Sequence, residues 1–308
     1  MDDRLLRTAR SLGGVFCSGD AHRVGLDDQE VDRLVGRGEV VRVRRGTFVV
    51  AEALRRASPE VAFSLRVRAV LRARGENVAA SHQSALALHR LPLHRVDLAR
   101  IDLVADVPRC RTKAGVTTHP DREVRVETVD GWRAVCASSA LVQVAAASGL
   151  ASGVVAMDAA LHRGVCSRSE LAAAAASLPL RGAGAALRAV ARVDPSSESV
   201  GETLTRLLLG DLGLAPRSQV EIRDALGVLV GRADFVVGEW VVVEFDGAVK
   251  YAGADGREAL VAEKRRESRL VELGFEVVRL TWADLDDPTE VLRRIRAARA
   301  RVLLRHSS

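Results

Sequence analysis

Helical and strand patterns alternate over the first fifty residues. Apolar residues recur at helical spacing over residues 5–12 and 27–37, with a short helical stretch over 18–24 between them. Alternating valines then predict two strands within residues 40–50, joined by a turn at Gly46. Three helices closed by a hairpin are the element order of a winged helix-turn-helix, which we expect over residues 1–50.

The middle of the chain, residues 51–195, has a mixed pattern and predicts an αβ connector. Helical periodicity covers residues 58–74 and 81–89, and short strand patterns follow at 101–104, 116–119 and 125–129. The uncharged run over 134–157 is long enough to span a bilayer, but serines and glycines interrupt it. We therefore expect two Ala-rich packing helices with a break between them.

Proline and serines over residues 193–199 mark the best domain boundary, and the pattern after it is clear. The expected order is helix, antiparallel strands, helix, strand, helix. The elements are a helix over 198–209, strands over 220–222, 227–230, 233–237 and 240–247, a helix over 257–273, a strand over 275–280 and a helix over 289–304. Residues 196–308 thus form the third expected domain.

Carboxylates stand in this last domain where strands should carry apolar residues. Asp234 interrupts one apolar strand, and Glu244 and Asp246 end the next on a shared face. A hairpin about Gly238 would place Asp234 opposite Glu244, where the two charges repel unless a cation lies between them. Oxygen ligands of this kind suit Mg²⁺ or Mn²⁺.

Composition is that of an ordinary globular protein, and the basic net charge favours a polyanionic partner. The 308 residues are 48% hydrophobic and 28% charged, with a net charge of +6. Basic residues predominate before Ser196 and acidic residues after it, which favours nucleic acid as a partner of the first part. The acidic N-terminus lacks an apolar signal core, and the four cysteines form no close pair, so we expect buried thiols in a cytoplasmic protein without membrane contact.

The hairpin region carries a family resemblance. Residues 38–48, with Arg42, Arg44 and Arg45, resemble the N-terminal winged-helix domain of AbiEi-type antitoxins, a module usually described as DNA-binding. The resemblance covers about the first fifty residues and implies a DNA-binding module. Arg42, Arg44 and Arg45, with Arg33 and Arg37, are the side chains available to contact a DNA backbone. The helix that would enter the major groove departs from the pattern, because Asp27, Asp28, Glu30 and Asp32 would repel phosphates. Packing of this domain against the rest of the chain or a protein partner is the alternative.

The acidic domain resembles the PD-(D/E)XK (restriction-endonuclease-like) superfamily. Three blocks carry the likeness, at residues 244–251, 263–267 and 278–285, and they are more closely similar to the endonuclease-like family related to the very-short-patch mismatch-repair endonuclease. The likeness covers about a hundred residues. It implies a metal-dependent phosphodiesterase fold.

The resemblance assigns roles residue by residue. Asp234 and Glu244 match the metal-binding acids of the two strands, and Glu202 takes the place of the first-helix glutamate that completes the metal shell. Asp246 stands where the superfamily has a lysine, so Glu-x-Lys is absent, and we include Asp246 among the candidate metal ligands. Lys250 is the available substitute for that lysine.

The following helix offers two more cations, Lys264 and Arg266, either as substitutes for the lysine or as phosphate contacts. Its mixed-sign run over 263–267 is equally typical of a solvated helix face.

The spacing of the histidines is weaker evidence for a site than the spacing of the acids in the last domain. His82 and His89 share a helical face with His94 just beyond, and a metal site there is conceivable. No acidic or cysteine ligand follows at a diagnostic spacing, so a structural or solvent-facing role is favoured. His119 and the remaining histidines stand alone and predict no catalytic role.

Three functions remain open from the sequence. The first is an α+β multidomain Mg²⁺- or Mn²⁺-dependent DNA endonuclease with catalytic Asp234, Glu244 and Lys250. The second is a non-catalytic DNA-binding regulator of the antitoxin type that keeps the nuclease fold as a scaffold. The third is a protein-interaction module, and either a protein partner or a homodimer is compatible with all three.

Overall fold

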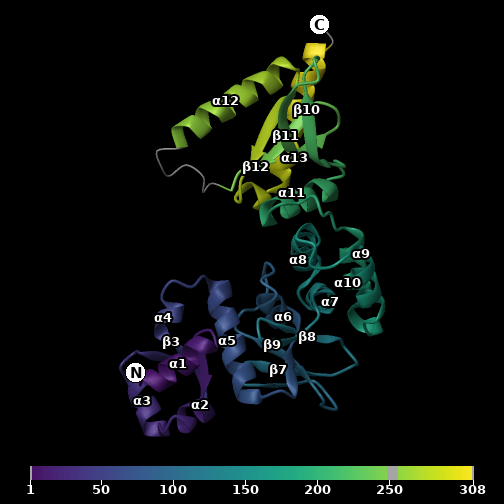
Figure 1. Ribbon diagram of the computed structural model, residues 1–308. Coiled ribbons are helices and arrows are strands. Elements are labelled where there is room, and N and C mark those ends of the chain that lie inside the picture. Colours follow the sequence, from purple (N-terminus) through teal and green to yellow (C-terminus); the bar gives the residue numbers. More distant parts are fainter. Residues whose placement is uncertain (1, 248–255, 307–308) are drawn as a thin grey trace. The chain divides into compact units, whose positions relative to one another are not determined.

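The computed structural model describes residues 2–247 and 256–306, which divide into two compact units (Figure 1). The N-terminal unit comprises the residues up to Ala160 together with Gly164–Ala191. The C-terminal unit comprises Leu161–Arg163 and the chain from Arg192 onward. The winged-helix region and the connector that we expected as separate domains lie in one unit, and several sheets are combined with helices throughout.

The N-terminal module contains the three expected helices and the expected hairpin. Its elements are α1 (Asp3–Ser11), β1 (Val15–Cys17), α2 (Ser18–Arg23), α3 (Asp28–Gly36), β2 (Val40–Arg44) and β3 (Thr47–Val50). The short strand β1 was not predicted, because three buried residues between two helices are too few to show a period. It pairs antiparallel with β3 and completes a sheet of order β1-β3-β2.

The module is packed against the following helices, α4 (Ala51–Leu54) and α5 (Pro59–Arg74). Val15 and Val49 of its sheet share a hydrophobic cluster with Leu65 and Ala69 of α5. Helix α5 begins at Ser58, whose hydroxyl accepts a hydrogen bond from the amide of Val61, and has proline in its first turn.

A buried ion pair joins α2 to α5. Asp20 is 1% exposed, and its two oxygens accept hydrogen bonds from Arg72, at 2.6 Å from Nη2 and 3.0 Å from Nε. The amide of Cys17 and the guanidinium of Arg23 bind the same carboxylate at 2.9 and 2.7 Å. Burial alone would raise the pKa of Asp20, but the hydrogen bonds from Arg72 and Cys17 outweigh it and lower this pKa to about 2.

A six-stranded mixed sheet of order β6-β7-β5-β4-β9-β8 forms the rest of the N-terminal unit. Its strands are β4 (Val78–Ala80), β5 (Ile101–Ala105), β6 (Arg111–Lys113), β7 (Val116–Pro120), β8 (Val126–Val129) and β9 (Trp132–Val135). Its helices are α6 (His82–Leu88), α7 (Ala137–Ser148), α8 (Leu150–His162), α9 (Arg168–Ala176) and α10 (Leu180–Ala191). Strands β5 and β7 are parallel neighbours.

The uncharged run over residues 134–157 forms α7 and α8, as predicted, and they are separated at Gly149, where φ is +96°. Within residues 2–247 and 256–306, no helix has both the length and the apolar character needed to cross a bilayer. The run instead supplies buried packing residues such as Leu141, Val144 and Met157.

The C-terminal unit is one sheet of order β10-β11-β12-β13 with helices on both faces (Figure 1). Its elements are α11 (Val200–Asp211), β10 (Arg217–Arg223), β11 (Leu229–Val237), β12 (Val241–Phe245), α12 (Gly256–Glu272), β13 (Glu276–Leu280) and α13 (Pro288–His306), with a 3₁₀ turn η1 (Asp284–Asp286). The expected element order is confirmed, and the two strands expected over 227–237 are one strand, β11.

The two faces of this sheet contain different cores. Val241 and Val243 of β12 pack with residues of α11 and α13 such as Leu209, Val291 and Ile295. Val236 and Val242 face the other way and pack with Leu270 of α12. This alternation follows from the two-residue period of a strand.

We expect Arg72→Met to lower the free energy of unfolding of the N-terminal unit by about 3–5 kcal/mol, because Asp20 then stays buried without its main counter-ion. Arg74→Met on the exposed side of the same helix is the control and should change it by less than about 0.5 kcal/mol. Urea denaturation followed by circular dichroism measures both.

The pH dependence of this pair follows from the lowered pKa of Asp20. Its stabilisation is complete above the ordinary pKa of 3.8 and is lost as the pH falls towards about 2. The stability difference between wild type and Arg72→Met should therefore shrink below about pH 4. A difference that persists unchanged at pH 2.5 would contradict an ionic origin.

Candidate functional site

The register of the β11–β12 hairpin brings two predicted acids together. Phe235 pairs with Val243, and continuing this antiparallel register by one residue places Asp234 opposite Glu244. Both lie on the face of the sheet that α12 covers, since they alternate with Phe235 and Val243 of the other face. The expected hairpin and the predicted proximity of the two carboxyl groups are thus both found.

Asp234 is half-buried and held by the backbone. Its Oδ2 accepts a hydrogen bond of 2.8 Å from the amide of Phe245, at the end of β12. Burial raises the pKa of Asp234 to about 6, and the nearby carboxylates of Glu202 and Glu244 act in the same direction. Near neutral pH this carboxyl group therefore carries an unfavourable negative charge that a cation would relieve.

Glu244 is neutralised by arginines. It is 9% exposed, and its Oε1 accepts a hydrogen bond of 2.7 Å from Nη2 of Arg266 on α12. Nε of Arg279 lies 3.7 Å from its other oxygen, because β12 and β13 are parallel and place Glu244 beside Arg279. Nη2 of Arg279 also pairs with Glu263 at 3.0 Å and Glu267 at 2.7 Å on α12, so the charges alternate across this face.

A close approach of α11 to β12 places Glu202. A Cβ atom on Gly201 would overlap the ring of Phe245, so only glycine allows this helix to lie so near the strand. The ring of Phe245 is also in edge contact with Trp282, at 4.9 Å between centroids. Glu202 accepts hydrogen bonds of 2.9 Å from the amide of Glu198 and from Nε2 of Gln219.

The other predicted residues lie in different surroundings. Asp246 follows β12 and donates its amide to the carbonyl of Leu280 at 2.8 Å. Lys264 is exposed on α12, whereas Arg266 on the same helix reaches Glu244. Lys250 lies outside the described residues. Sequence reasoning missed Arg279, and the only signal for it was an arginine that follows two valines near the end of a central strand.

These acids offer a partial fit for a divalent cation. Asp234 and Glu244 supply two hard oxygen donors, and Mg²⁺ is commonly held by one or two carboxylates and several waters. In the described part of the chain, Glu202, Asp234 and Glu244 do not gather as closely as the three-residue cluster of the N-terminal unit described below. A cation at this site would share Glu244 with Arg266.

In the N-terminal module, the acids of α3 have local partners. Asp27 and Glu30 cap the helix reciprocally, each side chain bonded to the other's amide at 2.8 Å. Asp28 lies 3.0 Å from Nε2 of His22, and Asp32 pairs with Arg42. The repulsion that we expected from these four carboxylates is therefore partly balanced within the module.

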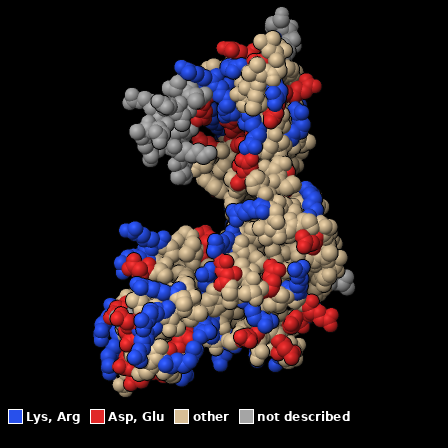
Figure 2. All heavy atoms as spheres, viewed as in Figure 1, with Lys and Arg blue, Asp and Glu red and all other residues tan. Residues whose placement is uncertain are grey.

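The three predicted DNA-binding arginines differ in their contacts. Arg42 pairs with Asp32 and lies over the ring of Phe48, 5.4 Å from its centroid. Arg44 donates a hydrogen bond of 3.0 Å to the carbonyl of Lys113 in the six-stranded sheet. Arg45 is exposed in the turn of the hairpin. Figure 2 shows basic side chains crowded over the N-terminal module with acidic ones among them.

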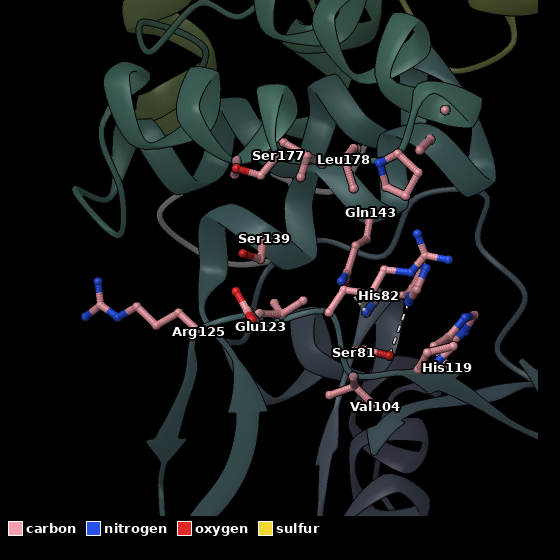
Figure 3. A pocket seen from close by; sticks show the side chains of 18 of the residues that line it. Ser81, His82, Val104, His119, Glu123, Arg125, Ser139, Gln143, Ser177 and Leu178 are labelled. Atoms are coloured by element: carbon pink, nitrogen blue, oxygen red, sulfur yellow. Dashed lines mark hydrogen bonds between the residues drawn. The ribbon is translucent and has the colours of Figure 1, made fainter. Parts of the chain in front are cut away.

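A pocket in the N-terminal unit contains a cluster that the sequence did not predict. Its volume is about 1100 Å³, and Figure 3 shows His82 and His119 side by side in its wall near Ser81. Their rings are stacked at 4.2 Å, and Nε2 of His119 lies 2.7 Å from Oδ1 of Asp102. The expectation that His119 stands alone was wrong, because parallel pairing of β5 and β7 places Asp102 and His119 two residues apart across the strands.

The pKa values of His82 and Asp102 in this cluster are both lowered. Burial and then the neighbouring His119 lower the pKa of His82 to about 4, so its imidazole is neutral near pH 7. Burial would raise the pKa of Asp102, but the hydrogen bond with His119 and the cation of Arg100 keep it below its usual value. The cysteines are free thiols, of which Cys17 and Cys136 are buried as expected, whereas Cys166 is partly exposed and Cys110, at this pocket, is exposed.

Comparison with known proteins identifies the N-terminal module. Residues 3–51 match the family described as "Transcriptional regulator, AbiEi antitoxin". This confirms the N-terminal part of the resemblance and no more of the chain. One similar solved structure is described as "Crystal structure of RV2827C protein from Mycobacterium tuberculosis", with 18% identity, a TM-score of 0.37, and coverage of 66% of this chain and 78% of that one. No curated protein matches the chain.

Ionisation of Asp234 should destabilise the C-terminal unit, so we expect Asp234→Asn to be more stable than wild type at pH 7. The pKa of Asp234 is raised from 3.8 to about 6, so the native state loses stability as the pH rises through this interval. The advantage of the variant should grow from near zero at pH 4 to roughly 1–2 kcal/mol at pH 7, allowing for partial solvent exposure. Thermal denaturation at several pH values measures it.

Glu272→Gln, at an exposed acid at the end of α12, controls for the loss of one negative charge. An advantage of Asp234→Asn that is equal at pH 4 and pH 7 would show that the amide acts by some means other than removing this charge.

Proposed function

We propose that this protein binds DNA through its N-terminal module and hydrolyses phosphodiester bonds with a divalent cation at the C-terminal unit. The observation that carries the proposal is the position of Asp234 opposite Glu244 at the end of the β11–β12 hairpin, with Arg266 beside them. The order helix, antiparallel strands, helix, parallel strand supports a PD-(D/E)XK-type fold. The family match of residues 3–51 to a transcriptional regulator supports DNA binding and a winged-helix fold there.

The crowding of carboxylates supports a role for the cation. Burial and the neighbouring acids make a negative charge on Asp234 unfavourable, and such crowding is relieved when a divalent ion binds. Bound Mg²⁺ or Mn²⁺ would polarise a phosphate oxygen and lower the pKa of a water molecule. Asp234 and Glu244 would hold the ion, with Glu202 and Asp246 as the further candidate ligands.

Arg266 is the residue best placed to fill the role of the missing lysine. It approaches the strand acids from α12, and its guanidinium already lies 2.7 Å from Glu244. A guanidinium can bind two oxygens of one phosphate at once, which suits a group that must position a phosphodiester and balance charge that develops on it. Turning from Glu244 towards the phosphate would also free that carboxylate for the ion. Lys250 remains the other candidate for this role.

A second function has its own support. Arg266 and Arg279 neutralise Glu244 without any metal ion, and this pairing is what a purely structural site would have. On this alternative, the protein is a non-catalytic DNA-binding regulator of the antitoxin type, with a protein partner or a second copy of the chain bound elsewhere. Cleavage assays distinguish the two functions.

We expect purified protein to cut DNA with Mg²⁺ or Mn²⁺ and not with EDTA, and either ion to raise its melting temperature. Plasmid, single-stranded DNA and mismatched duplex are the substrates to compare. Asp234→Ala and Glu244→Ala should lose both cleavage and the metal-induced rise, because the ion loses a ligand, and should keep DNA binding. If wild type cuts none of these substrates with either ion, the regulator alternative takes the place of the enzyme.

Variants of the cations identify the residue that replaces the lysine. Arg266→Met should lower the cleavage rate by about 100-fold or more, because charge stabilisation in the transition state is lost. Arg265→Met, at an exposed arginine of the same helix, is the matched control and should cut as wild type does. Lys250→Ala tests the competing candidate, and a large loss there with none in Arg266→Met would move the role to Lys250.

DNA affinity should fall steeply with salt, because phosphate contacts release counterions. The double variant Arg42→Ala, Arg45→Ala should weaken binding and reduce the slope of log K against log salt by about 1 per lost contact. Arg44 is left intact because it binds the carbonyl of Lys113. Arg188→Ala on the exposed side of α10 controls for charge, and an unchanged slope in the double variant would remove the hairpin from the interface.

A further inference from the structure

A thiol, an imidazole and a carboxylate lie in a row at the pocket of the N-terminal unit. Cys110 is in the loop between β5 and β6, His119 is on β7, and Asp102 is on β5. Sγ of Cys110 is 3.7 Å from Nδ1 of His119, and Nε2 of the same ring is 2.7 Å from Oδ1 of Asp102. Cys110 and His119 both line the pocket. The two ring nitrogens of His119 therefore contact the thiol on one side and the carboxylate on the other.

The carboxylate of Asp102 determines which nitrogen of His119 carries the proton. Asp102 is fully buried, and its Oδ2 accepts hydrogen bonds from Gln83 at 2.6 Å and from Arg100 at 3.0 Å. Since an ionised carboxylate only accepts hydrogen bonds, Nε2 of His119 carries the proton and the lone pair of the ring is on Nδ1. Nδ1 is the nitrogen beside Cys110, so it can take the proton of the thiol.

We propose that Cys110 is a nucleophile that accepts an acyl group from an ester or thioester bound in this pocket, with His119 as its base and Asp102 as the residue that positions the base. The thiolate is the reactive form of cysteine. A base beside the nucleophile, oriented in turn by a third group, is the arrangement that generates it. This activity goes beyond the proposed nuclease, because it uses no residue of the C-terminal unit and no metal ion.

The other three cysteines are less suited to this role. Cys17 and Cys136 are buried, so an electrophile cannot reach them without local opening. Burial raises the pKa of the Cys17 thiol. Burial, together with the neighbouring carboxylate of Glu170, raises the pKa of Cys166 to about 11, so this thiol stays protonated near pH 7. Cys110 combines an exposed sulfur with an imidazole neighbour.

His82 covers one face of the base. Its ring is stacked on that of His119, with 4.2 Å between centroids, and its Nδ1 lies 3.2 Å from the hydroxyl of Ser81. Because the pKa of His82 is lowered to about 4, mainly by burial, its neutral ring adds no second positive charge when His119 takes a proton. The backbone of His82 has φ of +49°, and Gln143 accepts a hydrogen bond of 3.0 Å from its amide. A non-glycine residue held in this region is strained, and such strain concentrates at functional positions.

The lining of the pocket indicates the kind of acyl group that it accepts. The volume is about 1100 Å³, and His82 and His119 lie at the same side of it (Figure 3). Helices α7 and α9 and the turn after α9 contribute small apolar side chains, which are Val142, Ala146, Ala147, Ala173, Ala174 and Leu178. Ligand pockets commonly hold the apolar body of a ligand in this way, while a few polar groups fix its reactive end. We therefore expect an apolar acyl chain along these helices, with its carbonyl carbon at Cys110.

The chemical step is an exchange of the acyl group. As Sγ of Cys110 bonds to the carbonyl carbon, the proton of the thiol passes to Nδ1 of His119. The bond from the carbonyl carbon to the leaving oxygen or sulfur then breaks, and the leaving group takes that proton, which gives a thioester of Cys110 and a free alcohol or thiol. Water then attacks the thioester with His119 as base, which releases a carboxylic acid and restores the thiol.

Acylation of the full chain by p-nitrophenyl hexanoate tests this proposal. With reduced wild type at pH 7, we expect a burst of nitrophenolate of up to one equivalent, and mass spectrometry after an acid quench should find the hexanoyl group on Cys110. The acetate ester should react more slowly, because its chain does not reach the apolar wall. EDTA is present throughout, so the result does not depend on a cation at the C-terminal unit, and this proposal and the proposed nuclease can fail separately.

Variants assign the roles, and circular dichroism checks that each is folded. Cys110→Ala alters an exposed side chain and should lose the burst, whereas Cys166→Ala, at a thiol outside the pocket lining, should keep it. His119→Gln should slow acylation at pH 7 by about 100-fold and shift its pH profile towards that of an ordinary thiol, with a pKa of about 8.5. Asp102→Asn should shift the profile in the same direction, because an amide can donate to Nε2 and move the proton of His119 to Nδ1.

Three results would overturn the nucleophile. They are the absence of a burst in wild type, a hexanoyl group found only on residues other than Cys110, and an unchanged pH profile in His119→Gln.

Discussion

The register of the β11–β12 hairpin determines where the charged groups of the C-terminal unit lie. Once Phe235 pairs with Val243, the two-residue period of the strands turns Asp234 and Glu244 to the same face and places them opposite each other. The parallel register of β13 then brings Arg279 beside Glu244, and α12 crosses that face with Arg266. A shift of one residue would bury these charges in the core formed by α11 and α13.

Buried carboxylates recur in both units, and their partners differ. Asp20 is held by two arginines and a backbone amide, Asp102 by Arg100, Gln83 and His119, and Glu244 by Arg266. The pKa values of Asp20 and Asp102 are lowered, so these charges are compensated in the native state. Asp234 differs because its pKa is raised, so its negative charge is not compensated in the native state. Among these acids it is the one whose ionised form a bound cation would stabilise most.

Many charged side chains of the N-terminal module are paired within the N-terminal unit itself. The acids of α3 are used for capping and for pairing with His22 and Arg42, and Arg44 binds the six-stranded sheet. The buried Asp20–Arg72 pair ties the module to α5. A module held in this way presents a fixed set of exposed basic side chains, of which Arg45 in the hairpin turn is one.

Local pattern was sufficient for the element order of the C-terminal unit and for the position of Asp234 opposite Glu244. Helical periodicity, the Gly238 turn and alternating valines are relations between residues that are close in the chain. They can therefore be recognised in the sequence alone. The same reasoning missed the short strands β1, β4, β6 and β9. It also could not choose among Lys250, Lys264 and Arg266, because which cation reaches Glu244 depends on how α12 lies on the sheet.

The histidine pocket shows most clearly what could not be predicted from the sequence. Asp102 and His119 are 17 residues apart in the chain, and His82 lies on a separate helix, so no spacing in the sequence links the three. Parallel pairing of β5 with β7 brings Asp102 and His119 together, and the hydrogen bond from the Asp102 amide to the Ser84 hydroxyl holds α6, which begins at His82, beside β5. What the sequence by itself determined was therefore most of the helices, the element order of the C-terminal unit and the hairpin acids. Only the tertiary structure decided the partners of each charge, because contacts between distant segments depend on packing that no local pattern records.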